Sequence, residues 1–352
     1  MICVIASFPS KQNEQDGMIQ RVVHIDTLMA STPRTYLDVS FRRFLRKQTR
    51  TENSATIYCV NVFAHFFFIW KLLRAARIVY IHSAYNALRI MAFPTSARII
   101  FDAHGAVPEE LTQEGRKGAA QILGVAERFI LRRCDILVCV TRAMLEHFNR
   151  KHGPRANRAE LVLPILPRFG ETADAANALQ SFRNTDSVIY AGGMQIWQNV
   201  DLMVEAASHR RELLYTFLTG DVAAFEAKLR DGGVNTFVCT KVKPAQVKDH
   251  YLTHNYGFVL RDEILVNQVA CPTKLMEYLY WGVLPIVITP NIGDFNAQNL
   301  RGVTLEQFRA GLLPDADAAE SMRRHNQSTV LALIDAAQAN QDRLQDQLLD
   351  GG

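Results

Sequence analysis

Short β-branched runs alternate with amphipathic stretches along most of the chain, and this alternation constrains the fold more than any other feature of the sequence. Alternating strand and helix patterns are typical of parallel sheets built from βαβ units. The sequence therefore predicts an α/β protein. In the first half the expected strands are 2–6, 35–39, 56–60, 77–81, 98–102 and 135–140, with helical patterns such as 119–133 between them.

The alternation breaks at residues 163–167 (LPILP) and restarts after a polar, alanine-rich stretch. A chain of 352 residues is too long for one ordinary core. We therefore predict two doubly wound domains, 1–168 and 169–316, and a last helix in 317–352 that packs back on the first domain. Ligands bind beyond the carboxyl ends of parallel strands, so function is expected on the loops after strands, at a central cleft. The strands expected in the second domain are 188–191, 214–218, 235–239, 256–260 and 285–289.

Charge is divided unevenly between the two halves. Residues 1–168 hold 24 Lys and Arg against 13 Asp and Glu, whereas residues 169–352 hold 15 against 22. This asymmetry indicates that the first domain meets an anionic surface. The alternative is two domains with unlike solvated faces. No nucleic-acid reader motif accompanies the basic half, so nucleic acid is not expected as a partner.

Two neighbouring segments of the first domain favour a membrane surface as that partner. Residues 41–47 (FRRFLRK) place four cations among three apolar side chains, and residues 63–77 (FAHFFFIWKLLRAAR) predict an apolar helix with a basic end. Such segments are attracted to anionic lipid. The longest apolar run, 57–70, is too short for a membrane span, which needs about 20 residues. The alternative is that 66–70 pack under the sheet.

Localisation follows from features that are missing from the sequence. The N-terminus lacks the basic and apolar regions of a signal peptide, and the six cysteines include no CxxC pair. Reduced thiols are typical of the cytosol. We therefore expect a cytoplasmic protein, bound peripherally at the inner face of the plasma membrane.

Residues 256–288 predict an anion site. A strand ends near residue 260, Pro272 is expected at the first helical position, and Gly282 is expected to end that helix. The free amides and positive dipole end of the helix can bind an anion, and Lys274 lies in its first turn. Glu277 follows on nearly the same face. A cation for a diphosphate and a carboxylate for vicinal hydroxyls describe a nucleotide-sugar site; the alternative is a surface Lys274–Glu277 ion pair.

Two further loops follow strands. Gly192 and Gly193 come directly after the strand at 188–191, where two glycines allow close backbone approach to a phosphate or sugar, unless they form an ordinary tight turn. His104 follows the strand at 98–102 and precedes Gly105, which places it at a sheet edge; a structural histidine is the alternative. His82, after the strand at 77–81, is a weaker candidate for acceptor contact.

Here the sequence resembles a known family. Residues 271–279 (CPTKLMEYL), closing with Trp281 and Gly282, resemble the donor-site motif of GT-B glycosyltransferases of the family-four type. Residues 188–193 (VIYAGG) resemble the glycine-rich loop of that domain, and 217–221 (FLTGD) resemble its next strand and turn. The resemblance covers roughly 187–290 and implies a GT-B fold of two Rossmann-like domains. It also implies that Glu277 holds the ribose and that the amides of Gly193 and Thr273, with Lys274, hold the diphosphate.

The first domain carries a second part of the resemblance. His104 resembles the active-site histidine of the family, which lies near the acceptor hydroxyl and the donor sugar. Residues 7–21 resemble the flexible loop after the first strand, in which Gly17 and Arg21 are expected to close over the donor.

Two departures from the family pattern bear on the donor. Val269 stands where many members have a first glutamate, and Gly193 and Gln198 stand where Arg and Lys are usual. Lys274, helped by Arg261, is expected to carry more of the neutralising role.

The resemblance implies a retaining hexosyltransferase. It would move a sugar from a UDP or GDP sugar to a hydroxyl of a glycan acceptor, lipid-linked by our interpretation, in cell-surface polysaccharide synthesis. No metal is expected, because the only D-x-D, at 315–317, lies just before the final helix, and no cofactor is expected besides the donor. The alternatives are a non-catalytic nucleotide-sugar or glycan binding protein of the same fold and a sugar-nucleotide epimerase.

Overall fold

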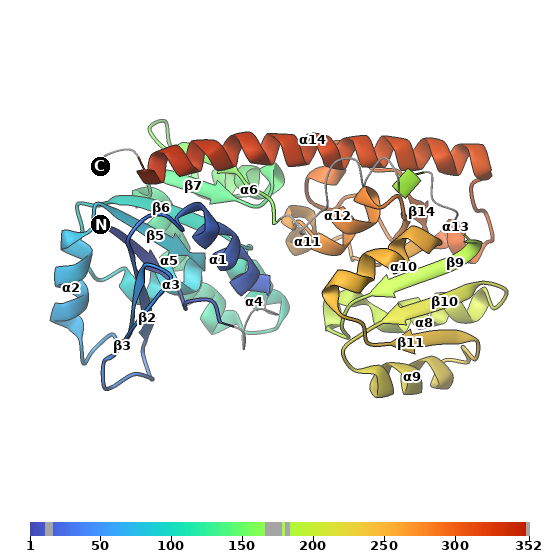
Figure 1. Cartoon of the computed structure of the whole chain (residues 1–352), viewed down its shortest axis with the longest axis horizontal. Helices are drawn as coiled ribbons and strands as arrows, with labels where there is room; N and C mark the ends of the chain where they lie inside the picture. Colours follow the sequence, from blue (N-terminus) through green and yellow to red (C-terminus); the bar gives the residue numbers. More distant parts are fainter. Residues whose placement is uncertain (11–16, 166–177, 180–183, 350–352) are drawn as a thin grey trace. The chain divides into compact units, whose positions relative to one another are not determined.

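The computed structural model describes residues 1–10, 17–165, 178–179 and 184–349 (Figure 1). The chain forms two compact units. Unit 1 comprises Met1–Ile165 and Ala336–Gly352, and unit 2 comprises Leu166–Asp335. Each unit contains its own sheet, so the predicted α/β class with two parallel-sheet domains is confirmed.

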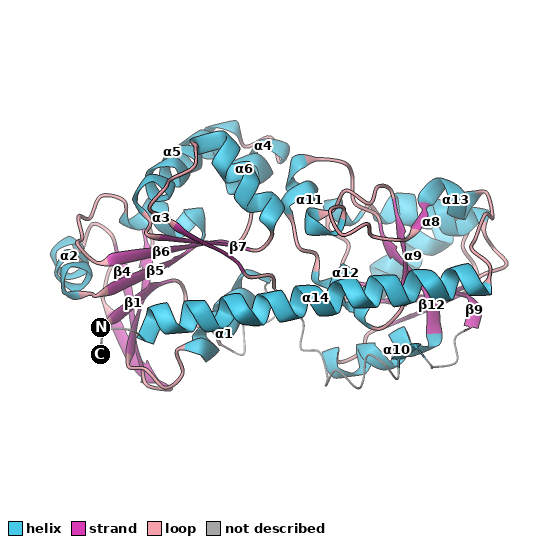
Figure 2. Ribbon diagram, turned by 90° about the horizontal axis from the view of Figure 1, so that it is seen from above, coloured by secondary structure: helices cyan, strands magenta, loops and turns pink. Residues whose placement is uncertain are grey.

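Unit 1 is built on a sheet of eight strands in the order β3-β4-β2-β1-β5-β6-β7-β8, with helices on both faces (Figure 2). Its elements are β1 (Ile2–Ile5), α1 (Gly17–Leu28), β2 (Arg34–Ser40), β3 (Gln48–Glu52), β4 (Ala55–Asn61), α2 (Phe66–Ala75), β5 (Ile78–His82), α3 (Ser83–Ile90), β6 (Arg98–Ala103), α4 (Val107–Gln113), α5 (Lys117–Arg133), β7 (Ile136–Cys139), α6 (Arg142–His152) and β8 (Ala159–Val162).

All pairs in this sheet are parallel except that of β3 with β4. Strands β1 and β5 are buried along their whole length, which is why they read as continuous apolar runs. Every residue of β3 is exposed. This strand was missed in the sequence because its residues, QTRTE, carry no apolar pattern.

Unit 2 contains a six-stranded sheet in the order β11-β10-β9-β12-β13-β14, and every pair in it is parallel. Its elements are β9 (Asn184–Ala191), α8 (Val200–His209), β10 (Leu214–Leu218), α9 (Val222–Asp231), β11 (Phe237–Thr240), α10 (Val247–Thr253), β12 (His254–Val259), α11 (Leu265–Val269), α12 (Thr273–Tyr280), β13 (Leu284–Val287), β14 (Val303–Thr304), α13 (Leu305–Arg309) and α14 (Ala316–Leu349), with short 3₁₀ turns at Ile196–Gln198, Pro244–Gln246 and Gly293–Phe295.

Helix α14 belongs to both units, because the division falls between Asp335 and Ala336. In unit 2 the Gln327 side chain donates to the carbonyl of Tyr280 at 2.9 Å. In unit 1 the Asn340 side chain donates to the carbonyl of Val162, also at 2.9 Å. The segment 317–352, predicted as one piece, is therefore shared between the two cores.

The apolar run at 57–70 divides between β4 and α2. Within α2 the buried residues are Ile69 and Leu73, whereas Phe67 is 77% exposed. The alternative in which 66–70 pack under the sheet therefore holds for Ile69 but not for Phe67. None of the helices in the described ranges is long and apolar enough to span a bilayer.

Candidate active site

His104 lies just beyond the carboxyl end of β6, as predicted. Strand β6 pairs in parallel with β5, and His82 is opposite Asp102 in the register. Because the two strands end at the same sheet edge, His104 comes to lie beside His82. The candidate site of unit 1, which contains His82 and His104, therefore lies at the neighbouring ends of β5 and β6.

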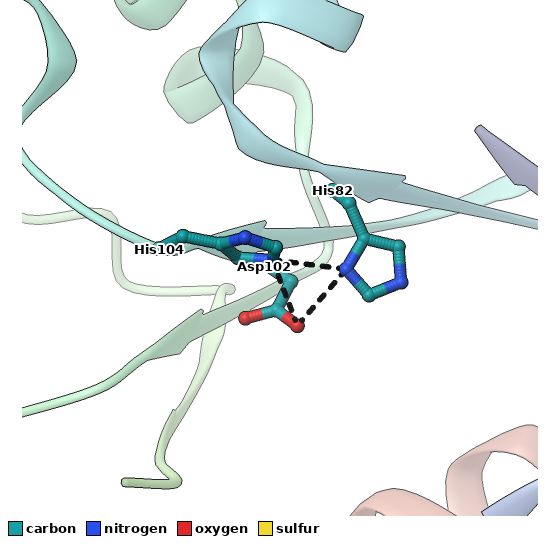
Figure 3. A group of neighbouring side chains, drawn as sticks. All are labelled: His82, Asp102 and His104. Carbon is teal, nitrogen blue, oxygen red and sulfur yellow. Dashed lines mark hydrogen bonds and ion pairs between the residues drawn. The ribbon is translucent and has the colours of Figure 1, made fainter. Parts of the chain in front are cut away.

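Three side chains meet at this edge (Figure 3). Nδ1 of His82 lies 2.9 Å from Nε2 of His104. Oδ2 of Asp102 lies 3.4 Å from the same His82 nitrogen and 3.6 Å from the same His104 nitrogen. All three side chains are at most 6% exposed. Asp102 was not singled out in the sequence, although an acid ending a buried apolar strand needs a partner.

Arg21 is that partner. Its guanidinium donates to both carboxylate oxygens of Asp102, with the shortest contact 3.0 Å, and both side chains are fully buried. Burial alone raises the pKa of Asp102, but Arg21 and the neighbouring His104 hold that pKa well below its usual value. The Tyr80 hydroxyl donates to Oδ2 at 3.0 Å and completes the shell of the carboxylate.

The structure contradicts the expected lid role of Arg21. The predicted flexible loop extended to residue 21, but helix α1 begins at Gly17, and Arg21 is bound to Asp102 inside unit 1. A guanidinium that is already paired in the core is not free to close over a ligand. Gly17 is the first residue of α1, and residues 11–16 of the expected loop lie outside the described residues.

Polar atoms without partners gather at the same strand ends. Within the part of the chain that the structure describes, Nε2 of His82, Nδ1 of His104 and Oγ of Ser83 are buried and have no hydrogen-bond partner. Ser83 also has a φ of 67°, which is strained for a residue other than glycine. Buried polar groups are normally satisfied. Their accumulation makes this strand edge a candidate site for water or for polar groups of a ligand.

The same three side chains could hold a metal ion, because one ligand atom from each lies within 4.8 Å of the others. However, Oδ2 of Asp102 already accepts hydrogen bonds from Arg21 and Tyr80. A divalent cation there would also lie close to the buried guanidinium, and like charges repel strongly where water is excluded. The donor set therefore fits a hydrogen-bonded cluster better than a metal centre.

Glu110, in α4, is a second group that sequence reasoning missed. Its carboxylate covers Gly105, where an added Cβ would come within 2.1 Å of Oε1. Burial, followed by repulsion from Glu114 and Glu109, raises the pKa of Glu110 to about 7. The signal available in the sequence was the acidic cluster at the start of the helix after His104.

Glu110 is expected to make stability fall as pH rises from about 4.5 to 7, because the folded state holds this proton more tightly than the unfolded state does. Glu110→Gln removes this dependence. We expect the variant to melt with wild type at pH 5 and a few degrees above it at pH 8 by calorimetry. Glu146→Gln, at an exposed carboxylate, serves as control. Parallel pH profiles for wild type and Glu110→Gln would contradict the assignment.

In unit 2 the predicted Gly192 and Lys274 lie side by side. The Lys274 ammonium lies 3.7 Å from the ring centroid of Tyr190 and 3.2 Å from Oε1 of Gln198. A Cβ on Gly192 would lie only 2.6 Å from Nζ of Lys274. The glycine is therefore needed because the ammonium occupies the space that a side chain would take.

Lys274 and Arg261 are two cations with no carboxylate in ion-pair contact among the described residues. Burial, and then the charge of Arg261, lowers the pKa of Lys274 well below its ordinary value. Burial also lowers the pKa of Arg261. Cations held together at such cost are typical of a site that an anion completes. We call Gly192, Gly193, Arg261, Lys274 and Glu277 the donor site.

Lys274 lies in the first turn of helix α12. The helix begins at Thr273, with Pro272 as the residue before it rather than as its first residue, and Gly282 follows its end with a φ of 72°. The Tyr251 hydroxyl donates to Oε2 of Glu277 at 2.9 Å. Burial raises the pKa of Glu277, against the opposing effects of Tyr251 and Lys274. Glu277 is thus held in place by a tyrosine, not by the predicted alternative of a surface ion pair.

Gly192→Ala should reduce the affinity for the nucleoside diphosphate that the resemblance implies, with UDP as the probe, by about tenfold. The new methyl group would displace the ammonium of Lys274, and about one hydrogen bond to the ligand would be lost. Isothermal titration calorimetry measures the change. Gly220→Ala is the matched control, since Gly220 also follows a strand but has open space around its Cβ position. Equal affinities for the two variants would show that the close packing of the Lys274 ammonium against Gly192 does not contribute to binding.

The comparisons with known proteins fit this geometry. Residues 2–164 match the family model described as Glycosyltransferase Family 4. No curated protein sequence matches the chain significantly.

Solved structures resemble the whole chain. Sucrose-phosphate synthase from Thermosynechococcus elongatus aligns over 100% of this chain and 99% of its own, with 13% identity and a TM-score of 0.68. Anabaena HepE in complex with UDP and glucose aligns over 97% and 98%, with 11% identity and a TM-score of 0.62. A trehalose-phosphate synthase from Burkholderia xenovorans aligns over 99% and 100%, with 11% identity and a TM-score of 0.60. At these identities the similarity establishes the fold. With the family match of residues 2–164, it makes the chain a glycosyltransferase of the GT-B type that is similar to glycosyltransferase family four.

Proposed function

We propose that the chain transfers a hexosyl group from a UDP-sugar to a hydroxyl of a glycan acceptor. The observation that carries this proposal is the donor site, in which Lys274 and Arg261 lie without a carboxylate in ion-pair contact among the described residues. A diphosphate would supply the missing negative charge, and Glu277 would accept hydrogen bonds from the ribose hydroxyls. UDP is favoured over GDP because HepE was crystallised with UDP and with UDP-glucose.

In this proposal the donor site acts mainly when the bond to the sugar breaks. Negative charge then grows on the leaving diphosphate, and the Lys274 ammonium and the amides of Gly193 and Thr273 stabilise that charge more than they stabilise the intact donor. These groups replace a metal ion in the reaction, so turnover is expected to survive EDTA. Unit 1 supplies His104 for the transfer step. Retention of the anomeric configuration is part of the proposal by resemblance to family four.

The test combines binding and turnover. We expect UDP and UDP-sugars to raise the melting temperature, whereas CMP and GDP at equal concentration have less effect. With a panel of glycan acceptors, a UDP-sugar should be consumed and a glycosylated product should appear by mass spectrometry, with and without EDTA. Absence of any nucleotide effect would refute the donor site. Nucleotide-sugar turnover without an acceptor would favour an epimerase instead.

A non-catalytic binding protein of the same fold is the second candidate. Val269, where family members often carry a glutamate, is 2% exposed and apolar. Loss of that carboxylate would remove contacts to the sugar while leaving the diphosphate contacts. UDP-sugar binding without product for any acceptor would favour this alternative.

We further propose that the acceptor is lipid-linked and that unit 1 meets the membrane through a basic aromatic surface made of residues 41–47 and 63–67. Phe41 and Phe63 join the two segments, with ring centroids 6.1 Å apart. Leu45, Phe63 and Phe67 are 71%, 73% and 77% exposed, and Arg42, Arg43, Arg46 and Lys47 are exposed around them. Exposed aromatic rings among cations suit an anionic lipid surface. This arrangement supports attachment to an anionic membrane surface; action at the cytoplasmic face of the plasma membrane and in cell-surface polysaccharide synthesis is part of the proposal by resemblance to the family.

Replacing Arg42, Arg43, Arg46 and Lys47 by serine should reduce binding to vesicles containing phosphatidylglycerol more than tenfold at low salt, since each basic residue contributes about 1 kcal/mol. Co-sedimentation measures the bound fraction. The control removes four exposed cations of helix α5, namely Lys117, Arg128, Arg132 and Arg133. Wild-type protein that stays in the supernatant at low salt, or an equal loss in the control, would refute the surface.

A further inference from the structure

The contact between His82 and His104 requires one proton. Nδ1 of His82 and Nε2 of His104 are 2.9 Å apart, so one of them donates and the other accepts. Two protons in this gap would clash, and none would leave two lone pairs facing each other. The carboxylate of Asp102 decides between the two arrangements.

The carboxylate favours the proton on His82. Oδ2 of Asp102 is closer to Nδ1 of His82, at 3.4 Å, than to Nε2 of His104, at 3.6 Å. A lone pair on Nδ1 of His82 would face that negative charge. Either arrangement leaves one buried ring N–H without an acceptor among the described residues, on Nε2 of His82 in one case and on Nδ1 of His104 in the other, so only the carboxylate distinguishes them. Burial lowers the pKa of His82 to about 4, so His82 carries one proton at neutral pH.

Once His82 donates, the proton of a neutral His104 must be on Nδ1. That atom is buried and has no partner among the described residues. Arg21 from α1 and Tyr80 from β5 donate hydrogen bonds to Asp102. His24 on α1 and Cys139 on β7 are the other titratable groups that interact with the Arg21–Asp102 pair. None of them supplies an acceptor to His104.

We propose that Asp102 and His82 are positioning residues that fix His104 with its proton on Nδ1, so that His104 donates a hydrogen bond to an oxygen of the transferred sugar. This rests on the proposed function for the identity of the sugar, but the tautomer itself does not. His82 then acts through His104 rather than by the acceptor contact expected from the sequence. Asp102 orients His82, and Arg21 keeps Asp102 ionised.

The tautomers can be measured directly in the full-length protein. Long-range ¹H–¹⁵N correlation spectra of ¹⁵N-histidine protein distinguish protonated from unprotonated ring nitrogens. We expect protons on Nδ1 of both His82 and His104 at pH 7.5, with Nε2 unprotonated in both rings. A proton on Nε2 of His104, or a doubly protonated ring, would overturn the proposal.

A matched pair of variants separates positioning from a purely structural role. His82→Asn keeps an N–H donor near the place of Nδ1, so His104 should keep its tautomer. His82→Leu removes the donor and leaves Asp102 as the nearest polar neighbour of Nε2, so the proton of His104 should move to Nε2. Identical spectra of His104 in both variants would overturn the proposal, provided both melt cooperatively.

Activity and metal binding give two further readouts. We expect kcat of His82→Leu to fall about tenfold, the loss of one hydrogen bond, with the donor KM unchanged and with His82→Asn close to wild type. Addition of one equivalent of ZnCl₂ should leave both rings unchanged; movement of both signals would identify a metal site and refute the hydrogen-bonded cluster. If the tautomers are as stated but His104→Ala keeps full activity, the role of His104 in the proposed function fails while the tautomer assignment stands.

Discussion

Lys274→Met is expected to weaken UDP binding by about 10- to 100-fold while the ligand-free protein stays at least as stable as wild type. The first effect follows because a charge-assisted hydrogen bond to phosphate, worth about 1.5–3 kcal/mol, is lost. The second follows because burial already lowers the pKa of Lys274 well below its usual value, so the charge is costly in the absence of an anion. Methionine keeps most of the length of the side chain and removes that cost.

Calorimetry measures both quantities. The control is Lys228→Met, because Lys228 is paired with Asp201 at the surface of the same unit. The control should bind UDP like wild type. Lys274→Arg keeps a cation that cannot lose its proton, so its affinity should not fall as pH rises, whereas that of wild type should. Wild-type affinity in Lys274→Met would place the diphosphate elsewhere.

His104→Ala is expected to lower kcat by about a hundredfold and to change the donor KM by less than about threefold. The ring belongs to unit 1, whereas the residues proposed to hold the donor belong to unit 2, so its contribution should concern the transfer step more than donor binding. Initial rates over a range of UDP-sugar concentrations measure the two constants. His209→Ala, at an exposed histidine, is the control. An unchanged kcat in His104→Ala would make this histidine a structural residue.

The donor site could be predicted because its parts follow strands in recognisable order. Gly192 after β9 and Lys274 at the start of α12 were expected at one sheet edge. The sequence did not predict that the Lys274 ammonium would fill the space beside Gly192, where a Cβ would lie 2.6 Å from Nζ. The Tyr190 ring beneath the ammonium was not expected, since Tyr190 reads only as part of a buried strand. Strand periodicity places a side chain on a face but does not reveal what packs against it.

The cluster in unit 1 was only half predicted, for a different physical reason. His82 and His104 were found because each follows an apolar strand. Arg21 was assigned to a loop by resemblance to the family's flexible loop. The sequence did not correct this, because α1 carries no acidic residue in its first turn and no basic residue in its last turn, the features that mark helix ends. Its partner Asp102 lies 81 positions away along the chain, and a buried ion pair between such distant residues has no local pattern in a single sequence.

The most direct measurement of the central claim is a crystal structure of the chain with UDP. Our account predicts a diphosphate oxygen within hydrogen-bonding distance of the Lys274 ammonium and the Gly193 amide, and ribose hydroxyls on the Glu277 carboxylate. UDP bound at another place on the chain, or bound with neither Lys274 nor Glu277 in contact, would contradict it.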